Sequence, residues 1–156
     1  MATQRKPHPV ARLLETLEAE KIRFMLIGMS AALVQGVMQT TLDVDLWIDL
    51  PPRQYMRVQN LARRTGCVVA ANTVVYATDG TPLNFVFEVN GLGSFQDELK
   101  HCVRLPFRGK KIPVLKLERI LKSKEFIRRD KDLPHIINIR DLLRCRRALK
   151  TRTSKK

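Results

Sequence analysis

The sequence predicts an α/β fold in one domain, with a mixed central sheet flanked by helices and a helical pair at the C-terminal end. Segments with helical and with strand periodicity alternate along the chain, which is typical of a sheet covered by helices. The 156 residues, 44% of them hydrophobic, can bury one core. Because no repeat or linker divides them, we expect one domain over 1–149 and a basic, disordered tail over 150–156.

The first half of the chain predicts two helices and two strands in alternation. Leucines at helical spacing predict a helix over 9–20, and a short apolar run predicts a strand over 23–28. Residues 29–35 favour a helix, with Gly36 at the place of a C-terminal cap. The stretch 42–50 alternates apolar and acidic residues, which predicts a strand that ends at a Pro-Pro pair.

The middle of the chain predicts a basic helix and then strands. Residues 52–65 form the helix, and two β-rich runs follow at 67–77 and 83–89, separated by the turn signal Asp79-Gly80.

The last third predicts a helix, a hairpin and two further helices. Ser94 is a suitable N-cap for a helix, because its hydroxyl can accept from an amide of the first turn. Asp132 is the expected N-cap of the final helix. The expected elements are helix 95–102, strands 103–107 and 111–115 joined by a turn at Arg108-Gly109, and helices 117–128 and 132–149.

Composition indicates a cytoplasmic protein whose positive charge attracts anionic partners. Lys and Arg number 29 against 15 Asp and Glu, a net charge of +14, which attracts nucleic acid, nucleotides or acidic partners. A well-solvated basic surface is the alternative interpretation. No apolar run is long enough for a bilayer, so no membrane partner is expected. The three scattered cysteines fit reduced thiols better than disulfides or a metal site.

The stretch 26–50 carries the candidate chemistry. A strand passes through Gly28 directly into a helix, which leaves backbone N–H groups free for a phosphate, and Ser30 adds a hydroxyl there. Asp43 and Asp45 are two apart on the next strand, so their carboxylates emerge from one face, roughly 7 Å apart at their roots. Such oxygen ligands suit Mg²⁺ with substrate phosphates. The alternative is the solvent face of an edge strand.

At these residues the sequence resembles the minimal nucleotidyltransferase families of the DNA polymerase beta superfamily, which include relatives of abortive-infection nucleotidyltransferase toxins. The resemblance covers residues 23–145 and has two parts that occur in the expected order. The first part matches at Gly28, Ala31, Gly36, Thr41, Asp43 and Asp45, and the second at Lys124, Arg129, Lys131 and Asp132.

The resemblance implies a nucleotidyltransferase fold and the transfer of a nucleoside monophosphate from an NTP, such as ATP, to an acceptor hydroxyl. It implies that Asp43 and Asp45 bind Mg²⁺ or Mn²⁺. It also implies that the two aspartates and Asn84 are the catalytic residues. It further implies that the nucleotide is bound by the helix start at Gly28, Met29 and Ser30, and by Lys124 and Lys131. RNA or another polyanion is a candidate acceptor, and an acidic partner protein is a further candidate.

Three positions depart from the family pattern and define an alternative function. Asn84 stands where the family has a third carboxylate, Met29 where a second Gly or Ser is expected, and Gln39 at the usual Arg. Glu88 would point to the same side as Asn84 but lies roughly 13 Å further along the strand. The alternative is therefore a catalytically degenerate protein of this fold that binds nucleotide or nucleic acid without turnover.

Overall fold

The centre of the molecule is a seven-stranded mixed sheet, seen in a computed structural model that describes residues 6–153. The strand order is β3-β4-β5-β2-β1-β7-β6. The pairs β1/β7 and β2/β5 are parallel and the other pairs are antiparallel. The strands are β1 Phe24–Ile27, β2 Val44–Ile48, β3 Val68–Ala71, β4 Val74–Tyr76, β5 Pro82–Val86, β6 Cys102–Phe107 and β7 Lys110–Leu115. The predicted mixed sheet is confirmed.

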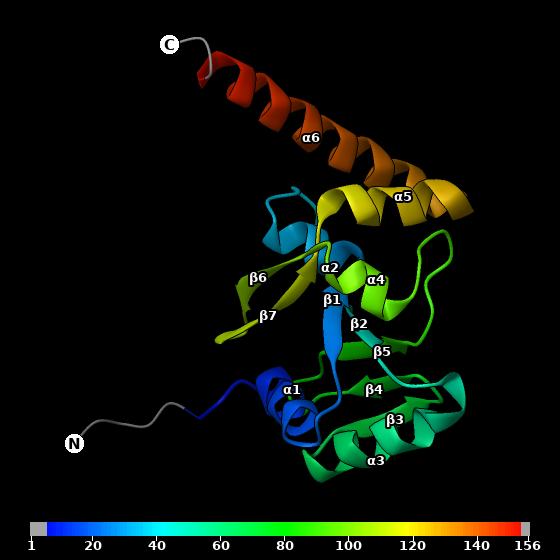
Figure 1. Ribbon diagram of the computed structural model, residues 1–156. Helices are drawn as coiled ribbons and strands as arrows, with labels where there is room; N and C mark the ends of the chain where they lie inside the picture. Colours follow the sequence, from blue (N-terminus) through cyan, green and yellow to red (C-terminus); the bar gives the residue numbers. More distant parts are fainter. Residues whose placement is uncertain (1–5, 154–156) are drawn as a thin grey trace, which may run out of the picture.

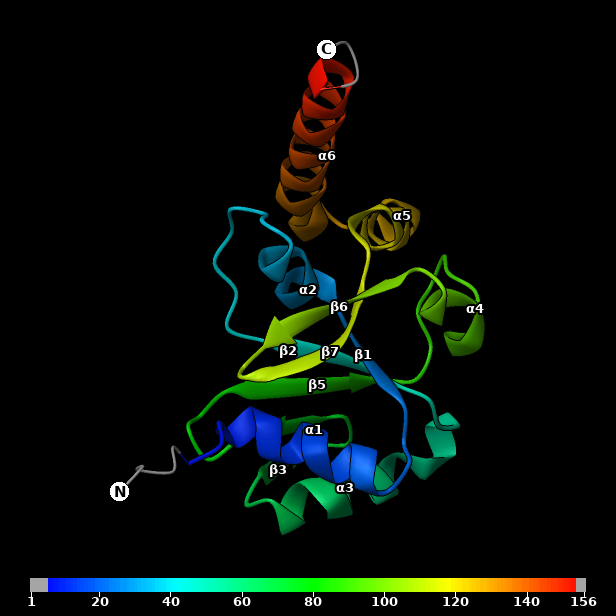
Figure 2. The ribbon, with the colours of Figure 1, turned by 60° about the vertical axis from the view of Figure 1, so that its left-hand side comes forward.

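Helices cover the sheet from two sides. In Figures 1 and 2, α1 and α3 lie together on one side of the molecule, and α2, α5 and α6 on the opposite side. The α-helices are α1 Pro9–Ala19, α2 Gly28–Val34, α3 Tyr55–Arg64, α4 Phe95–Leu99, α5 Leu117–Ile127 and α6 Leu133–Thr153, with short 3-10 turns η1 Pro52–Gln54 and η2 Asp130–Asp132. Within residues 6–153, no helix is both long and apolar enough to cross a bilayer.

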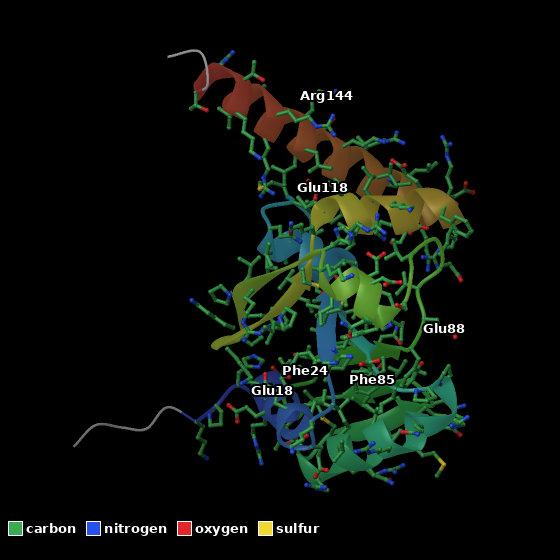
Figure 3. All side chains as sticks on the ribbon, viewed as in Figure 1. Glu18, Phe24, Phe85, Glu88, Glu118 and Arg144 are labelled. Carbon is green, nitrogen blue, oxygen red and sulfur yellow. The ribbon has the colours of Figure 1, made fainter. Side chains whose placement is uncertain are left out.

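The core forms because apolar side chains of the central strands meet leucines of the helices. All four residues of β1 are buried, and Phe24 and Phe85 point into the interior (Figure 3). The face of α1 that carries Leu13, Leu14 and Leu17 is fully buried, as its spacing predicts. Burying such a side chain contributes about 1.5–3 kcal/mol, which holds helices and sheet in one unit.

Turn and cap residues place the later elements as predicted. Arg108 and Gly109 both have positive φ values, 52° and 84°, which match the twist of a two-residue hairpin between β6 and β7. Ser94 Oγ accepts from the Asp97 amide at 3.1 Å and so caps α4. The turn at Gly80 (φ 86°) joins β4 to β5.

Other boundaries differ from the expectation. The run 67–77 is two strands, β3 and β4, because the chain turns at 72–73 and pairs with itself. The helix expected over 95–102 ends at Leu99, and Cys102 already begins β6. The last helix runs to Thr153, so residues 150–153 of the expected tail are helical, whereas 154–156 lie outside the described residues.

Asp132 differs from its expected role as the cap of the final helix. It ends η2, and its carboxylate accepts from Arg129 and Lys124. Asp132 directly precedes α6, but its side chain is 2% exposed and its carboxylate is engaged by Arg129 and Lys124.

The register of the central strands places the candidate residues in one row. Ile27, the last residue of β1, pairs with Asp45 of β2, and Asp45 pairs with Asn84 of β5. Directly paired residues point to the same side of a sheet, and neighbouring strands are about 4.8 Å apart. Asp45 and Asn84 therefore lie side by side next to the start of α2.

Candidate active site

A cavity of about 280 Å³ lies where this row of the sheet meets α5 and η2. Gly28, Asp45 and Asn84 reach it from the sheet side, and Lys124 from α5. The rest of the lining is Ile27, Val86, Val89, Leu115, Ile120, Ser123, Ile127, Arg129 and Asp132. Apolar walls around a few charged groups are typical of a ligand site.

Asp45 is the central ionisable group of the cavity. Burial raises its pKa above the ordinary value, and the nearby charge of Asp43 raises it further. A hydrogen bond from the Asn84 amide and the charge of Lys124 act in the opposite direction but do not outweigh burial. A divalent cation at this carboxylate would relieve both the desolvation and the repulsion.

Gly28 leaves the room that the Asp45 carboxylate occupies. A Cβ at this position would lie 2.3 Å from Asp45 Oδ2, so the Asp45 side chain would have to move. The φ of Gly28 is also +66°, a region that favours glycine. The Ser30 hydroxyl donates to the Ile27 carbonyl at 3.0 Å and accepts from the Asp45 amide at 3.4 Å. Gly28 and Ser30 thus fix α2 against β2.

Lys124 is held over the cavity by a cluster of charged groups. Its Nζ lies 3.4 Å from Asp132 Oδ1 and 3.3 Å from His135 Nδ1, and Arg129 Nε donates to Asp132 Oδ2 at 2.8 Å. Burial would raise the pKa of Asp132, but the hydrogen bond from Arg129 and the charge of Lys124 lower it to about 2. Burial and the charge of Lys124 lower the pKa of His135, so its neutral ring can accept from Lys124.

The chain reversal at Arg128 brings these groups together. Arg128 ends α5 in the left-handed conformation (φ 50°, ψ 52°), and its amide donates to the Lys124 carbonyl at 2.8 Å. The chain then turns back through η2, which places Asp132 beside the last turn of α5.

The donor set of the cavity fits a hard divalent cation. Asp43 lies one residue before β2 and is exposed, close enough for its charge to act on Asp45. Asp45 and the Asn84 amide oxygen are oxygen donors of the cavity lining, whereas Asp43 is not part of that lining. Mg²⁺ takes one or two carboxylates together with substrate phosphates. Among residues 6–153, no group of three or more His, Cys, Asp or Glu forms a metal site, so phosphate oxygens and water would have to complete the shell.

Other residues singled out in the sequence lie outside the cavity lining. The Met29 side chain is buried in the core, and Lys131 is exposed on η2. Gln39 accepts from Asn138 of α6 at 2.9 Å. Glu88 lies beyond the end of β5 and is exposed at the edge of the molecule (Figure 3), away from Asn84.

Trp47 follows Asp45 by two residues but packs in the core. Its side chain is 1% exposed, Nε1 donates to the Phe87 carbonyl at 3.2 Å, and its ring meets Phe95 edge to face. Sequence reasoning also missed the contact of His135 with Lys124, because three scattered histidines give no local signal. A histidine at the third position of a helix that follows the Lys-Asp motif is the only hint the sequence offers.

Comparison with known proteins identifies solved structures that have a similar fold. No family model and no curated protein matches the chain. A solved lincosamide antibiotic adenylyltransferase with lincomycin bound is similar, with a TM-score of 0.58, 16% identity, and coverage of 88% of this chain and 98% of that chain. The solution structure of the antibiotic-resistance factor ANT(2'')-Ia has a TM-score of 0.53 and 14% identity, covering 94% of this chain and 91% of that chain.

The chain has the nucleotidyltransferase fold. A crystal structure of ANT(2'')-Ia with adenylyl-2''-tobramycin matches as well, with a TM-score of 0.55, 15% identity, and coverage of 84% of this chain and 83% of that chain. The fold predicted from the Gly28–Asp45 stretch is thereby confirmed. Within the nucleotidyltransferase fold of this chain, Asp45, Asn84 and Lys124 share one cavity, whereas Lys131 does not line it.

Proposed function

We propose that the protein is a metal-dependent nucleotidyltransferase, which transfers a nucleoside monophosphate from an NTP to an acceptor hydroxyl. The observation that carries the proposal is the cavity in which Asp45, next to Asp43, faces Lys124 across the start of α2. The Asp45 carboxylate on one wall, with the charge of Asp43 nearby, and a cation on the other suit a metal-bound triphosphate, because each charged part of the ligand meets an opposite charge.

The roles of the residues follow from their positions. Asp43 and Asp45 would hold Mg²⁺ or Mn²⁺, which when bound supplies charge stabilisation to the phosphoryl group. Lys124 would bind phosphate oxygens, and Asp132 would keep its ammonium over the cavity. Gly28, Met29 and Ser30 would offer the first backbone amides of α2, while Asn84 would orient the Asp45 carboxylate and the acceptor.

The acceptor hydroxyl is proposed to belong to a small molecule or to RNA. The similar solved structures contain lincomycin and adenylyl-2''-tobramycin, both small molecules. The net charge of +14 supports a polyanionic acceptor such as RNA, because a basic protein attracts polyanions. A transfer assay should therefore supply lincomycin, tobramycin and total RNA in parallel.

The decisive experiment replaces both carboxylates. With α-³²P-labelled NTPs, Mg²⁺ and each acceptor, we expect Asp43→Asn/Asp45→Asn to lose at least 100-fold in transfer, in the range that loss of strong electrostatic stabilisation produces. The matched control is Asp97→Asn/Asp141→Asn, which removes the same charge at two exposed positions outside the cavity. Undiminished transfer by the first double variant contradicts the proposal.

A second candidate function rests on Asn84. An amide cannot take a proton from an attacking hydroxyl, and here it donates a hydrogen bond to Asp45. This favours a protein that binds an NTP without efficient turnover.

The variant Asn84→Asp separates the two candidates. If the site is degenerate, the wild-type protein binds NTP with Mg²⁺ but transfers no label, and Asn84→Asp gains transfer because a third carboxylate becomes available. If the site is active, the wild-type protein transfers label and Asn84→Asp changes the rate less than about tenfold. Equilibrium NTP binding, measured beside transfer, distinguishes a loss of affinity from a loss of chemistry.

A further inference from the structure

The last helix, α6, projects away from the rest of the molecule. It packs on the body through the buried residues Ile136, Ile139 and Leu143. Every residue from 144 to 153 is exposed, and within this stretch the Arg146 guanidinium donates to the Gln35 carbonyl. Figures 1 and 2 show this end of α6 with no other helix or strand beside it. Ten residues at 1.5 Å each form an arm of about 15 Å.

The arm is strongly cationic and contains no acid. Arg144, Arg146, Arg147, Lys150 and Arg152 carry its five positive charges. Arg144 has a loose, exposed contact of 3.8 Å with Asp141, and in Figure 3 its side chain extends into solvent. Within the described residues, the side chains of Arg147, Lys150 and Arg152 make no ion pair.

Such a helix is poorly stabilised by its own contacts. Arg144 and Arg147 are three residues apart, and Arg146 and Lys150 are four apart, spacings at which like charges repel on a helix. A ten-residue helical segment that does not pack against the rest of a protein is only marginally stable in water. An anionic partner would remove the repulsion, so the arm gains stability when it is bound.

The distribution of charge around α6 selects the kind of anion. At 100° per residue, the five cations cover roughly 240° of the circumference, so they face in several directions at once. Only a partner with negative charge on more than one side can meet them together. A membrane surface offers charge on one side, and the arm exposes a single large apolar side chain, Leu149, for insertion.

We propose that α6, from Arg140 to Thr153, binds double-stranded DNA by entering its major groove. A helix with side chains is about 10–12 Å across, close to the groove width of about 12 Å, and phosphates line both walls. The major groove of RNA duplexes is too narrow for a helix, and this part of α6 has no aromatic residue on which single-stranded bases could stack. Arg144, Arg147, Lys150 and Arg152 contact phosphates, so binding depends little on sequence.

A hollow at the base of the arm supports the same ligand class. Arg140, Arg144 and Arg147 surround a space of about 290 Å³, floored by Leu121 and Leu143. Arg140 is paired with Glu125 at 2.9 Å. Arg144 has only its exposed contact of 3.8 Å with Asp141, and Arg147 makes no ion pair with any described residue, so both guanidiniums can reach a phosphate that flanks the groove. This inference concerns α6 alone and does not rest on nucleotidyl transfer.

The test measures binding of a fluorescent 20-base-pair duplex of mixed sequence by anisotropy, between 50 and 200 mM NaCl. The variant is Arg144→Gln/Arg147→Gln/Lys150→Gln. The matched control is Arg53→Gln/Arg57→Gln/Arg63→Gln, which removes the same charge from exposed positions at η1 and α3, on the opposite side of the molecule. Circular dichroism and thermal unfolding verify that both variants are folded.

We expect the plot of log affinity against log salt to be less steep by about 2.7 for the α6 variant, because three phosphate contacts are lost at about 0.9 each. The control should keep the wild-type slope. An unchanged slope in the α6 variant, or an equal loss in the control, overturns the proposal. Tighter binding of single-stranded RNA or of polyglutamate than of the duplex overturns the assignment to DNA.

Discussion

Gly28 and Asp45 are packed so closely that the cavity depends on the absence of one methyl group. In Gly28→Ala the new Cβ would lie 2.3 Å from Asp45 Oδ2, so the carboxylate must move. We expect metal-dependent NTP binding to weaken at least tenfold. The positive φ adds strain of about 1 kcal/mol, measured as a loss in the free energy of unfolding.

Gly80→Ala is the matched control for that prediction. Gly80 has a φ of +86° as well, but a Cβ there would meet nothing within 4 Å. The two variants should lose similar stability from backbone strain, and only Gly28→Ala should lose NTP binding. Equal NTP affinity in both would show that the carboxylate position is not set by Gly28.

Asp132 makes stability depend on pH in the acid range. Its pKa is about 2 in the folded protein and about 3.9 in an unfolded chain. The stabilisation of about 2 kcal/mol is therefore complete above pH 4 and is lost as the pH falls toward 2. In urea unfolding, we expect the wild type to lose about 1.5 kcal/mol more than Asp132→Asn between pH 4.5 and 2.5.

Asp141→Asn serves as the comparison for Asp132→Asn, because Asp141 is exposed. It should keep the wild-type response to acid. Asp132→Asn should also weaken NTP binding at pH 7, since the ammonium of Lys124 then loses its anchoring carboxylate. Parallel acid profiles of the wild type and Asp132→Asn would contradict the assigned role.

Single residues differ in how far the sequence reveals them. The strand pattern predicts Asp45, and the resemblance to nucleotidyltransferases assigns Asn84, whereas the register that pairs the two residues comes from the structure. His135 was not predicted, because its contact with Lys124 crosses a chain reversal and no periodicity connects residues on either side of one.

Among the elements, the end of α5 decides where Lys124 and Asp132 meet. Arg128 adopts the left-handed conformation (φ 50°) that glycine adopts without cost. We expect Arg128→Gly to raise the free energy of unfolding by about 0.5–1 kcal/mol, measured in urea, and to leave NTP binding unchanged. Arg128→Ala, which also removes the charge, should give no gain. If both variants are destabilised alike, the side chain rather than the backbone matters.

Element types were easier to predict than element ends. The hairpin of β6 and β7 was predicted because Arg108-Gly109 is a strong turn signal between two β-rich runs. The sequence predicts one β-rich run over 67–77, since its residues favour strands on both sides of the turn at 72–73. Local propensity alone leaves that turn undetermined, and pairing of β3 with β4 settles it.

At the scale of the whole molecule, the buried pair of Glu98 and Arg119 connects α4 to α5. Arg119 Nε donates to Glu98 Oε2 at 2.8 Å, and the Gly93 amide donates to Glu98 Oε1 at 3.2 Å. The hydrogen bond from Arg119 lowers the pKa of Glu98, so the carboxylate stays charged although its side chain is 2% exposed. The loop after β5 is thereby fixed beside the helix that carries Lys124.

The sequence by itself determined the α/β class, the order of most elements and the two carboxylates beside a glycine-started helix. These depend on periodicity and on turn residues, which act over a few positions of the chain. Only the tertiary structure decided that Asp45, Asn84 and Lys124 share a cavity, that Trp47 and Met29 belong to the core, and that α6 projects beyond the body. Those outcomes depend on strand order and helix packing, which bring together residues far apart in the chain.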